Sequence, residues 1–550
     1  MRSLSRLILA VSVVAISGCR DAATPCIGTC GTAVVVGPEP DILFPAATRQ
    51  DAGTAVSDLV FLKLADMSPS LNTAGDTGFA PGLATSWTRE SPTSVRFHLD
   101  RRARWHDGRP VTASDVTFTF DVYRDTLVNS GARPLLREIS DVTAPDSLTA
   151  VFRFGTVYSE QVFDAVNHMR ILPRHLLDTI PRKDLATHAF GRQPVGSGPF
   201  RFVRWVPGQY VELAADTGFF LGRPGLARVI WQVGADPAAM ITQLVAGEAD
   251  LMPTLGVPEN VARVRQAPHL RVIESAPPFY NYIGFNLREA GNRSRPHPLF
   301  ADRDVRRAIS MAVDRAAVVA AVLGPEARVG SGPLAHTLWI YSDSVRALPF
   351  DTAEARRLLN ARGWTARDGD GVLLRGGRRL EFELLVPVVS QPRRRAAVIV
   401  QEQLRRVGIA MRISELDFNL FVSRGPEGRF DAIFGAWSQD PSPRSIEQSW
   451  GTAGIGGSNW GGYSSPAFDR LARAAINASD LAVARRYWRE AVAQINADAP
   501  AIWMYSIRPL AGVHRRFQNA AIRPDLLAAL LWTWRVDPDS LLPRDRVIAP

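Results

Sequence analysis

Residues 380–413 read LEFELLVPVVSQPRRRAAVIVQEQLRRVGIAMRI, and this stretch decides the fold class. Its first part, Leu380 to Val386, predicts a strand, and residues 393–407 predict a helix that ends at Gly408. Residues 409–413 predict a second strand. A strand, a helix and a strand in this order indicate a βαβ unit with parallel strands, so the sequence predicts an α/β protein.

Helices and strands alternate on both sides of this unit. Asp304, Asp314 and Asp351 each predict the start of a helix on its N-terminal side, and residues 430–437 and 501–506 predict strands on its C-terminal side. In the first half of the chain, a hairpin is predicted around Pro207-Gly208, and strands at 33–36, 95–99 and 148–154. A chain of 550 residues is expected to form about three domains.

The first 18 residues have the pattern of an export signal. Arg2 and Arg6 precede an apolar run at residues 7–16, which is shorter than the roughly 20 residues of a membrane-spanning helix. The run leads into Ile-Ser-Gly-Cys19, which resembles a bacterial lipobox. We expect Cys19 to carry lipid and residues 19–32 to tether the protein to a membrane in the periplasm or cell envelope. The alternative is an ordinary secretory signal with a chance cysteine.

The composition is that of a globular protein, with 46% hydrophobic and 21% charged residues. The net charge is +10, but basic and acidic residues are mixed along the chain, so we expect no binding of nucleic acid. Cys26 and Cys30 lie in the tether, and a Cys-x3-Cys metal site would need two more ligands. A disulfide or free thiols are therefore expected there.

Motifs for catalysis or for a cofactor are not found in the sequence. There is no His-Glu-x-x-His, no glycine-rich loop before either lysine and no Gly-x-Ser-x-Gly. A calcium loop starting at Asp368 would need a glutamate where Arg379 stands, so a hairpin turn is predicted there. His106 and Asp107 are adjacent in a turn and are not expected to act as a pair. We therefore expect a binding protein and not an enzyme, without a cofactor or metal.

Four segments together resemble family 5 of the extracellular solute-binding proteins, the peptide- and nickel-binding family of ABC importers. They are WHDGRPVTASDV at 105–116, GSGPF at 196–200, the helix within 298–315, and the segment 430–440 followed by 459–463. The resemblance implies a two-lobed periplasmic-binding-protein-like clamp of type II with an extra inserted domain.

The resemblance also implies where the domains lie. Domain I, in lobe 1, would be discontinuous and would consist of residues 33–56, 190–278 and 507–550. Domain II, at 57–189, would be inserted into lobe 1, and domain III, at 279–506, would form lobe 2. Ligand binding would close the lobes of a monomer, which would then dock on the permease subunits of an ABC importer.

Asp440 is the candidate ligand anchor. It follows the strand predicted at 430–437, and open α/β sheets bind ligands outside the carboxyl ends of their strands. The ammonium of a short peptide loses water in a closed cleft and needs a counter-charge. In peptide-binding relatives an aspartate at this spacing from Trp437 has that role. The alternative is that Asp440 is a turn residue before Pro441.

Further candidate ligand-binding residues surround Asp440 in the sequence. Gly435 and Ser438 would offer a strand edge to an extended peptide. The cleft wall would include Trp437, Asn459, Trp460 and Tyr463, for which core packing or simple loop structure is the alternative.

The sequence departs from the family after Asp440, where Pro441-Ser442-Pro443-Arg444 stands. This difference leaves the peptide length open, with Arg424 and Arg444 as candidates for binding a ligand carboxylate. The rival functions are binding of another solute, such as a nickel chelate, an opine or an oligosaccharide, and an exported hydrolase.

Overall fold

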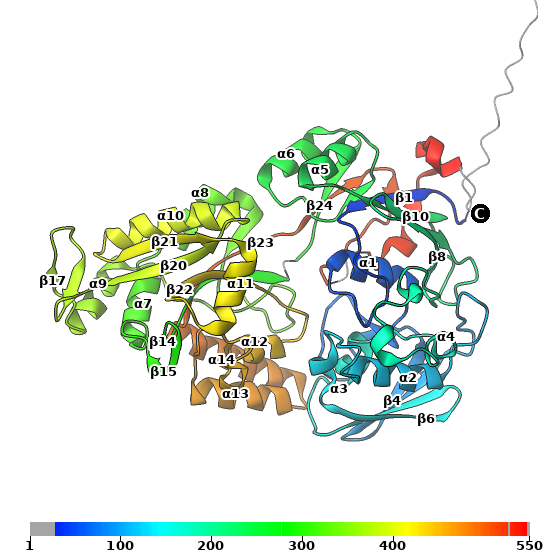
Figure 1. Ribbon diagram of the computed structural model, residues 1–550, viewed down its shortest axis with the longest axis horizontal. Coiled ribbons are helices and arrows are strands. Elements are labelled where there is room, and N and C mark those ends of the chain that lie inside the picture. Colours follow the sequence, from blue (N-terminus) through cyan, green and yellow to red (C-terminus); the bar gives the residue numbers. More distant parts are fainter. Residues whose placement is uncertain (1–27, 277, 526–527, 547–550) are drawn as a thin grey trace, which may run out of the picture.

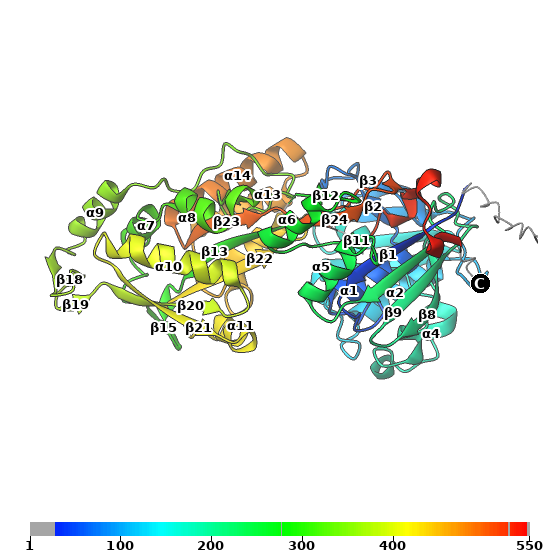
Figure 2. The ribbon, with the colours of Figure 1, turned by 90° about the horizontal axis from the view of Figure 1, so that it is seen from above.

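The computed structural model describes residues 28–276, 278–525 and 528–546, which form two lobes that lie side by side (Figures 1 and 2). The expected signal segment, Cys19 and Cys26 lie outside these residues. Cys30 is disulfide-bonded. In the described part of the chain, no helix is long and apolar enough to cross a membrane.

Lobe 1 is built on a seven-stranded sheet whose strands come from the beginning, middle and end of the chain. Strand β1 lies in its centre and is parallel to both of its neighbours. The hairpin predicted around Pro207-Gly208 is confirmed as β8 and β9 at one edge. In spatial order the strands are β12 (Leu270–Glu274), β24 (Leu510–His514), β11 (Leu251–Met252), β1 (Thr32–Gly37), β10 (Arg228–Val233), β9 (Tyr210–Ala215) and β8 (Phe200–Val206).

Both faces of this sheet are buried, as the unbroken apolar run of β1 requires. Val34 and Val36 pack with helices α5 (Pro237–Val245) and α6 (Pro258–Gln266) on one face. Val35 packs in the cluster that includes helix α1 (Asp51–Val60) on the other face. Sequence analysis did not identify α1.

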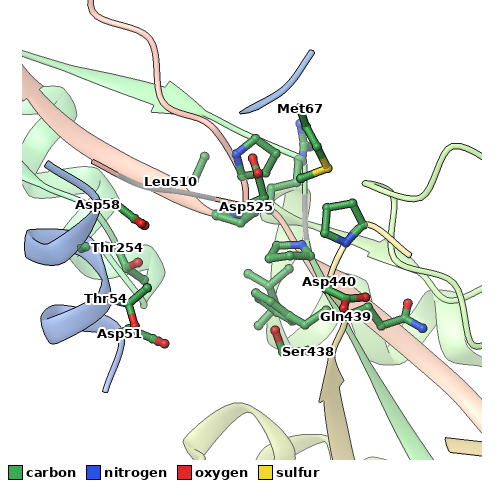
Figure 3. Close-up of a pocket in the computed structure, with 18 of the residues that line it drawn as sticks. Asp51, Thr54, Asp58, Met67, Thr254, Ser438, Gln439, Asp440, Leu510 and Asp525 are labelled. Carbon is green, nitrogen blue, oxygen red and sulfur yellow. The ribbon is translucent and has the colours of Figure 1, made fainter. Parts of the chain in front are cut away.

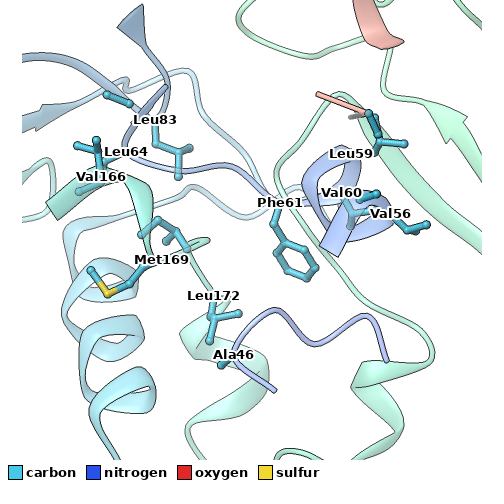
Figure 4. Packing of buried hydrophobic residues seen from close by; sticks show 14 of the residues in the cluster. Ala46, Val56, Leu59, Val60, Phe61, Leu64, Leu83, Val166, Met169 and Leu172 are labelled. Atoms are coloured by element: carbon cyan, nitrogen blue, oxygen red, sulfur yellow. The ribbon is translucent and has the colours of Figure 1, made fainter. Parts of the chain in front are cut away.

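A smaller antiparallel sheet belongs to the same lobe. Its strands are, in spatial order, β4 (Ala84–Ser91), β5 (Ser94–Leu99), β7 (Thr149–Phe154) and β6 (Ile139–Asp146). The helices beside it are α2 (Ala113–Arg124), α3 (Gln161–Asn167) and α4 (Arg174–Leu177). Phe61 directly after α1, Val166 of α3 and Met169 of the loop after α3 share one core (Figure 4). The small sheet is therefore expected to move with lobe 1 as one body.

Two of the segments that carry the family resemblance pack on each other. The backbone N–H of His106 donates to the carbonyl of Gly196 over 2.8 Å, and the His106 ring lies 3.0 Å from the carbonyl of Gly198. A Cβ at Gly196 would lie 1.9 Å from the Val60 carbonyl oxygen, so only glycine fits there. His106 and Asp107 face different partners, since Asp107 contacts His175 at 2.7 Å. These segments therefore serve the fold of lobe 1.

Lobe 2 is built on a six-stranded mixed sheet. The predicted βαβ unit is confirmed, because β20 and β21 are parallel and helix α10 (Gln391–Arg405) connects them. Strand β22 is also parallel to β20 but antiparallel to β13. In spatial order the strands are β16 (Ala327–Val329), β23 (Ala501–Ile507), β13 (Phe279–Phe285), β22 (Ala432–Ser438), β20 (Glu381–Pro387) and β21 (Ala410–Leu416).

Helices surround this second sheet (Figure 1). They are α7 (Arg303–Met311), α8 (Arg315–Val322), α9 (Thr352–Ala361), α11 (Phe418–Glu427), α12 (Arg444–Trp450), α13 (Pro466–Asn477) and α14 (Leu481–Asp498). Asp314 and Asp351 cap α8 and α9 as predicted. The prediction for Asp304 is wrong, because Asp302 caps α7 and accepts a hydrogen bond from the Asp304 N–H. Both positions are aspartates, so composition alone did not select between them.

Short hairpins complete the fold. The turn predicted at Asp368 is confirmed between β17 (Ala366–Arg367) and β18 (Leu373–Arg375), which pairs in turn with β19 (Arg378–Arg379). The others pair β2 (Ala65–Met67) with β3 (Phe79–Pro81), β14 (Arg288–Glu289) with β15 (Asn292–Pro296), and β25 (Phe517–Gln518) with β26 (Arg535–Val536).

The chain passes between the two large sheets twice. The first passage runs from the end of β12 at Glu274 to the start of β13 at Phe279, and the second from Ile507 of β23 to Leu510 of β24. Short connections of this kind are where two lobes rotate against each other, so both passages are expected to act as hinges.

Candidate functional site

A cavity of about 670 Å³ lies between the lobes, beside the two passages of the chain. Lobe 1 contributes residues of α1 and of the segment before α6, and lobe 2 contributes the end of β22 and the residues after it. Figure 3 shows Asp51, Thr54 and Asp58 of α1 on one wall and Ser438, Gln439 and Asp440 on the other. Anything bound in this cavity contacts both lobes at once.

Asp440 is a half-buried carboxyl on the lobe 2 wall, two residues after the end of β22. One carboxylate oxygen accepts a hydrogen bond from the Ser442 N–H at 3.2 Å, and among the described residues Asp440 forms no ion pair. Loss of water raises its pKa to about 6, although the nearby His168 and Arg444 favour the charged form. A desolvated acid without a cationic partner is a good receptor for a positively charged group.

Gln439 holds this part of the wall in place. Its side-chain oxygen accepts from the Ala335 N–H at 2.7 Å, and its amide nitrogen donates to the Pro333 carbonyl at 3.3 Å. Its backbone N–H donates to the Pro278 carbonyl at 2.7 Å, next to the first passage between the lobes. The backbone before Asp440 is therefore fixed by buried hydrogen bonds, while Ser438 is exposed to the cavity.

The lobe 1 wall carries charges that are mostly paired. Asp58 pairs with Arg170 at 2.6 Å. Lys63 donates to the Asn167 side chain at 2.9 Å, and burial, together with Arg170, lowers the Lys63 pKa to about 8. These contacts leave this wall close to neutral.

Other charged groups at the cavity are paired with residues behind it. Asp525 pairs with Arg523 at 2.6 Å and Glu326 with Arg265 at 3.0 Å. In the part of the chain that the structure describes, Asp440 and the exposed Asp51 are lining carboxylates without an ion pair. In the same part, no group of three histidine, cysteine or acidic side chains is suited to hold a metal ion.

Strand β22 has a partly free edge next to Asp440. It pairs with β13 along its whole length, but with β20 only at Ala432 and Ile433. Residues 434–438 therefore form no second ladder. Of the two predicted edge residues, Ser438 lines the interlobe cavity, whereas Gly435 is buried and is not among the lining residues. An extended chain binds to such an edge by main-chain hydrogen bonds.

The predicted aromatic wall lies elsewhere in lobe 2 and does not line the interlobe cavity. Trp437 and Trp460 are half-buried and contact each other, with ring centres 4.9 Å apart. Asn459 is buried and donates to the carbonyls of Gly451 and Tyr463 at 2.9 and 2.8 Å. Tyr463 is buried as well and donates to Asp498 at 2.7 Å. Asn459 therefore stabilises its own loop, and Tyr463 attaches that loop to the end of α14.

No sequence motif indicated the lobe 1 half of the cavity. Asp51, Asp58, Lys63, His168 and Arg170 line it, and none was identified beforehand. For Asp51 and Asp58 the only sequence signal is the weakly amphipathic pattern of residues 51–60, which indicates no binding role, and Lys63, His168 and Arg170 lie outside that pattern. Arg444, a candidate for binding a ligand carboxylate, pairs instead with acidic residues of lobe 1.

Two lobes with their own sheets, joined by two short passages and separated by a cavity, define a solute-binding clamp of the type II class. The chain belongs to the bacterial extracellular solute-binding proteins of family 5, whose middle region matches residues 78–458. This family consists of transport proteins that bind a substrate outside the cell membrane.

Known proteins match this chain in sequence and structure over most of its length. The oligopeptide-binding protein AppA of Bacillus subtilis strain 168 is 27% identical over 474 residues, which cover 85% of this chain and 84% of AppA. The solved structure of AppA from Bacillus subtilis in complex with a nonapeptide matches with a TM-score of 0.75 and 25% identity, covering 93% of this chain and 100% of that chain. NikZ from Campylobacter jejuni in complex with Ni(L-His) is 22% identical, with a TM-score of 0.75 and coverage of 92% and 99%, and shares the fold.

Proposed function

We propose that this protein captures short peptides in the interlobe cavity and delivers them to an ABC importer. The observation that carries the proposal is the half-buried carboxyl of Asp440, which faces the cavity and forms no ion pair with another described residue. A peptide ammonium supplies that partner through charge-assisted hydrogen bonds. The likeness to an oligopeptide-binding protein whose structure contains a nonapeptide supports the same assignment.

The end of β22 at Ser438, which lines the cavity and has no partner in β20, supports an extended peptide next to Asp440. Hydrogen bonds to a peptide backbone do not depend on its side chains. The side chains of the peptide would then occupy the cavity together with water, which gives broad specificity. Rotation about the two passages would close the lobes over the ligand.

The arrangement around this site is part of the proposal. Cys19 carries the lipid that holds the protein at the membrane, and the protein acts as a monomer without catalysis. Domain I comprises 33–56, 190–278 and 507–550, domain II comprises 57–189, and domain III comprises 279–506. The separate apolar clusters of the two lobes support the boundary between domain III and the rest of the chain, whereas domains I and II share one cluster.

Native mass spectrometry of the purified protein with its co-purified ligands tests the proposal. A mixed set of short peptides is the expected result. A single non-peptide ligand, such as a nickel chelate, an opine or an oligosaccharide, would overturn it. Incubation with a defined peptide addresses the hydrolase alternative, because a binding protein returns the peptide at its original mass.

A further inference from the structure

A buried ion pair joins the two lobes close to Asp440. Arg444 is the first residue of α12 in lobe 2, and Glu160 and Asp164 lie at the start of α3 and within it in lobe 1. The Nε atom of Arg444 lies 2.5 Å from a carboxylate oxygen of Glu160, and its Nη2 pairs with Asp164. Glu160 is 2% exposed and Asp164 is fully buried. The side chain of Arg444 therefore crosses from one lobe into the interior of the other.

Other groups make the same crossing, so the ion pair is part of a built interface. The Ser442 hydroxyl donates to Glu160 at 2.5 Å. The indole N–H of Trp339 in lobe 2 donates to the Thr73 hydroxyl in lobe 1 at 2.9 Å. Ile476 of α13 packs against the apolar core of lobe 1 as well as against that of lobe 2. We call this set of contacts the Arg444 contact.

The buried charges in the Arg444 contact are compensated. Burial by itself would raise the pKa of Asp164, but the Arg444 guanidinium and His168 hold it below its usual value. The Tyr158 hydroxyl donates to Asp164 at 2.7 Å, and the Arg444 guanidinium lies 5.2 Å from the centre of the Tyr158 ring. A buried carboxylate pair with these partners is stable only while Arg444 stays between the lobes.

The Arg444 contact also determines where Asp440 lies. Ser442 connects the two sites, because its N–H donates to Asp440 and its hydroxyl donates to Glu160. The segment from Asp440 to Arg444 is thus attached to α3 of lobe 1 by its own side chains. Beyond Asp440, the two lobes are therefore in direct contact through Ser442, Arg444 and Glu160.

We propose that Arg444 is a positioning residue that docks the Asp440 segment against α3 and closes the cavity beyond Asp440. The proposal rests on the proposed function in one respect, namely that Asp440 binds the ligand ammonium. A closed end requires that the ammonium be the terminus of the ligand. Peptides with an acylated amino end would lose the charge and also collide with the Arg444 contact.

The test compares Arg444→Gln with Arg444→Lys, which keeps the charge, and with Arg405→Gln as a matched control. Arg405 lies on the outer face of α10 and pairs with Glu402 on the same helix. Small-angle X-ray scattering of the ligand-free proteins measures how far the lobes separate. We expect a larger radius of gyration for Arg444→Gln, an intermediate one for Arg444→Lys and the wild-type value for Arg405→Gln.

Calorimetric titration with tetraalanine and with N-acetyl-tetraalanine completes the test. Arg444→Gln is expected to bind tetraalanine at least tenfold more weakly than wild type and to discriminate less against the acetylated peptide. A variant with the wild-type radius and the wild-type preference would overturn the proposal. If wild type binds neither peptide, the proposed function fails, while the scattering comparison still decides the role of Arg444.

Glu160→Gln provides a second route to the same answer if Arg444→Gln does not fold. It removes one charge partner of Arg444 at nearly constant volume. We expect it to enlarge the ligand-free radius of gyration in the same direction, and an unchanged radius would count against the Arg444 contact.

Discussion

At the scale of single residues, the carboxyl of Asp440 links pH to binding. Its pKa in the ligand-free protein is about 6, so the receptor for an ammonium is ionised above this pH and protonated below it. We expect the affinity for tetraalanine to change little around pH 7, where the carboxyl is ionised and the peptide amino group, with a pKa of about 8, is still charged. Well below pH 6 it should fall towards tenfold per pH unit. Asp440→Asn should bind more than tenfold more weakly at pH 7, because the desolvated ammonium is left without a partner.

Calorimetric titrations of both proteins between pH 5 and pH 7.5 measure this effect. Asp440→Asn should lack the dependence that wild type shows in this range. A wild-type affinity that does not change from pH 5 to pH 7.5 would contradict the assigned role of Asp440.

The same carboxyl is expected to lower stability when it is ionised. Its folded pKa is raised above the unfolded value, so ionisation costs stability above pH 6, and this cost disappears as the pH falls below about 4. Asp440→Asn should therefore melt roughly 1–2 °C higher than wild type at pH 7.5, and the difference should shrink at pH 4.5. Scanning calorimetry at both pH values checks this, and a lower melting temperature of the variant at pH 7.5 would show the sign to be wrong.

At the scale of elements, β22 combines a packed residue with an exposed end. A Cβ at Gly435 would lie 2.7 Å from the ring of Tyr282, which is itself buried against the rings of Trp450 and Trp503. Gly435→Ala should therefore destabilise the protein by about 1–3 kcal/mol, measured by denaturant unfolding. Gly369→Ala is the matched control, because no atom lies within 4 Å of its added Cβ.

Titration with tetraalanine separates packing from binding at Gly435. If the folded variant binds with wild-type affinity, Gly435 serves packing alone. Loss of affinity without loss of stability would instead indicate that the Gly435 backbone contacts the ligand, as the strand-edge prediction states.

Secondary-structure elements were predicted correctly where a short stretch of sequence contains one clear pattern. The βαβ unit from β20 to β21 was predicted because its apolar strands and amphipathic helix follow one another, and Asp314 and Asp351 were identified as helix caps. Helix α1 is amphipathic but was not predicted. Gly53 and Ser57 are buried on its apolar face and interrupt the apolar stripe that would have identified it. Capping side chains accept bonds within three residues, so a short window of sequence contains the signal.

The contacts between lobes have no such local signal. Arg444 and Glu160 are 284 positions apart, and their pairing depends on how two separately folded lobes meet. The position of Asp440 after β22 was predicted from the sequence because strand ends define sites in α/β folds. The residues that face it from lobe 1 could be identified only in the folded chain.

At the scale of the whole molecule, the inserted sheet and the large sheet of lobe 1 share a core, whereas lobe 2 has clusters of its own. The lobes are joined by two short passages and the Arg444 contact. Units with separate cores unfold separately unless their interface is large and apolar. We therefore expect the ligand-free protein to show two overlapping transitions in scanning calorimetry.

A ligand that contacts both lobes should bring these transitions together. Binding to the folded state adds about 2.7 kcal/mol when the free ligand is at 100 times its dissociation constant, and both lobes must be folded for this gain. Tetraalanine should therefore raise the lower transition most. Asp440→Asn should respond to it less than wild type, and Arg444→Gln should show transitions further apart than wild type before ligand is added. A single transition in the ligand-free protein would contradict separate unfolding of the lobes, and transitions that tetraalanine does not shift in wild type would contradict its binding between them.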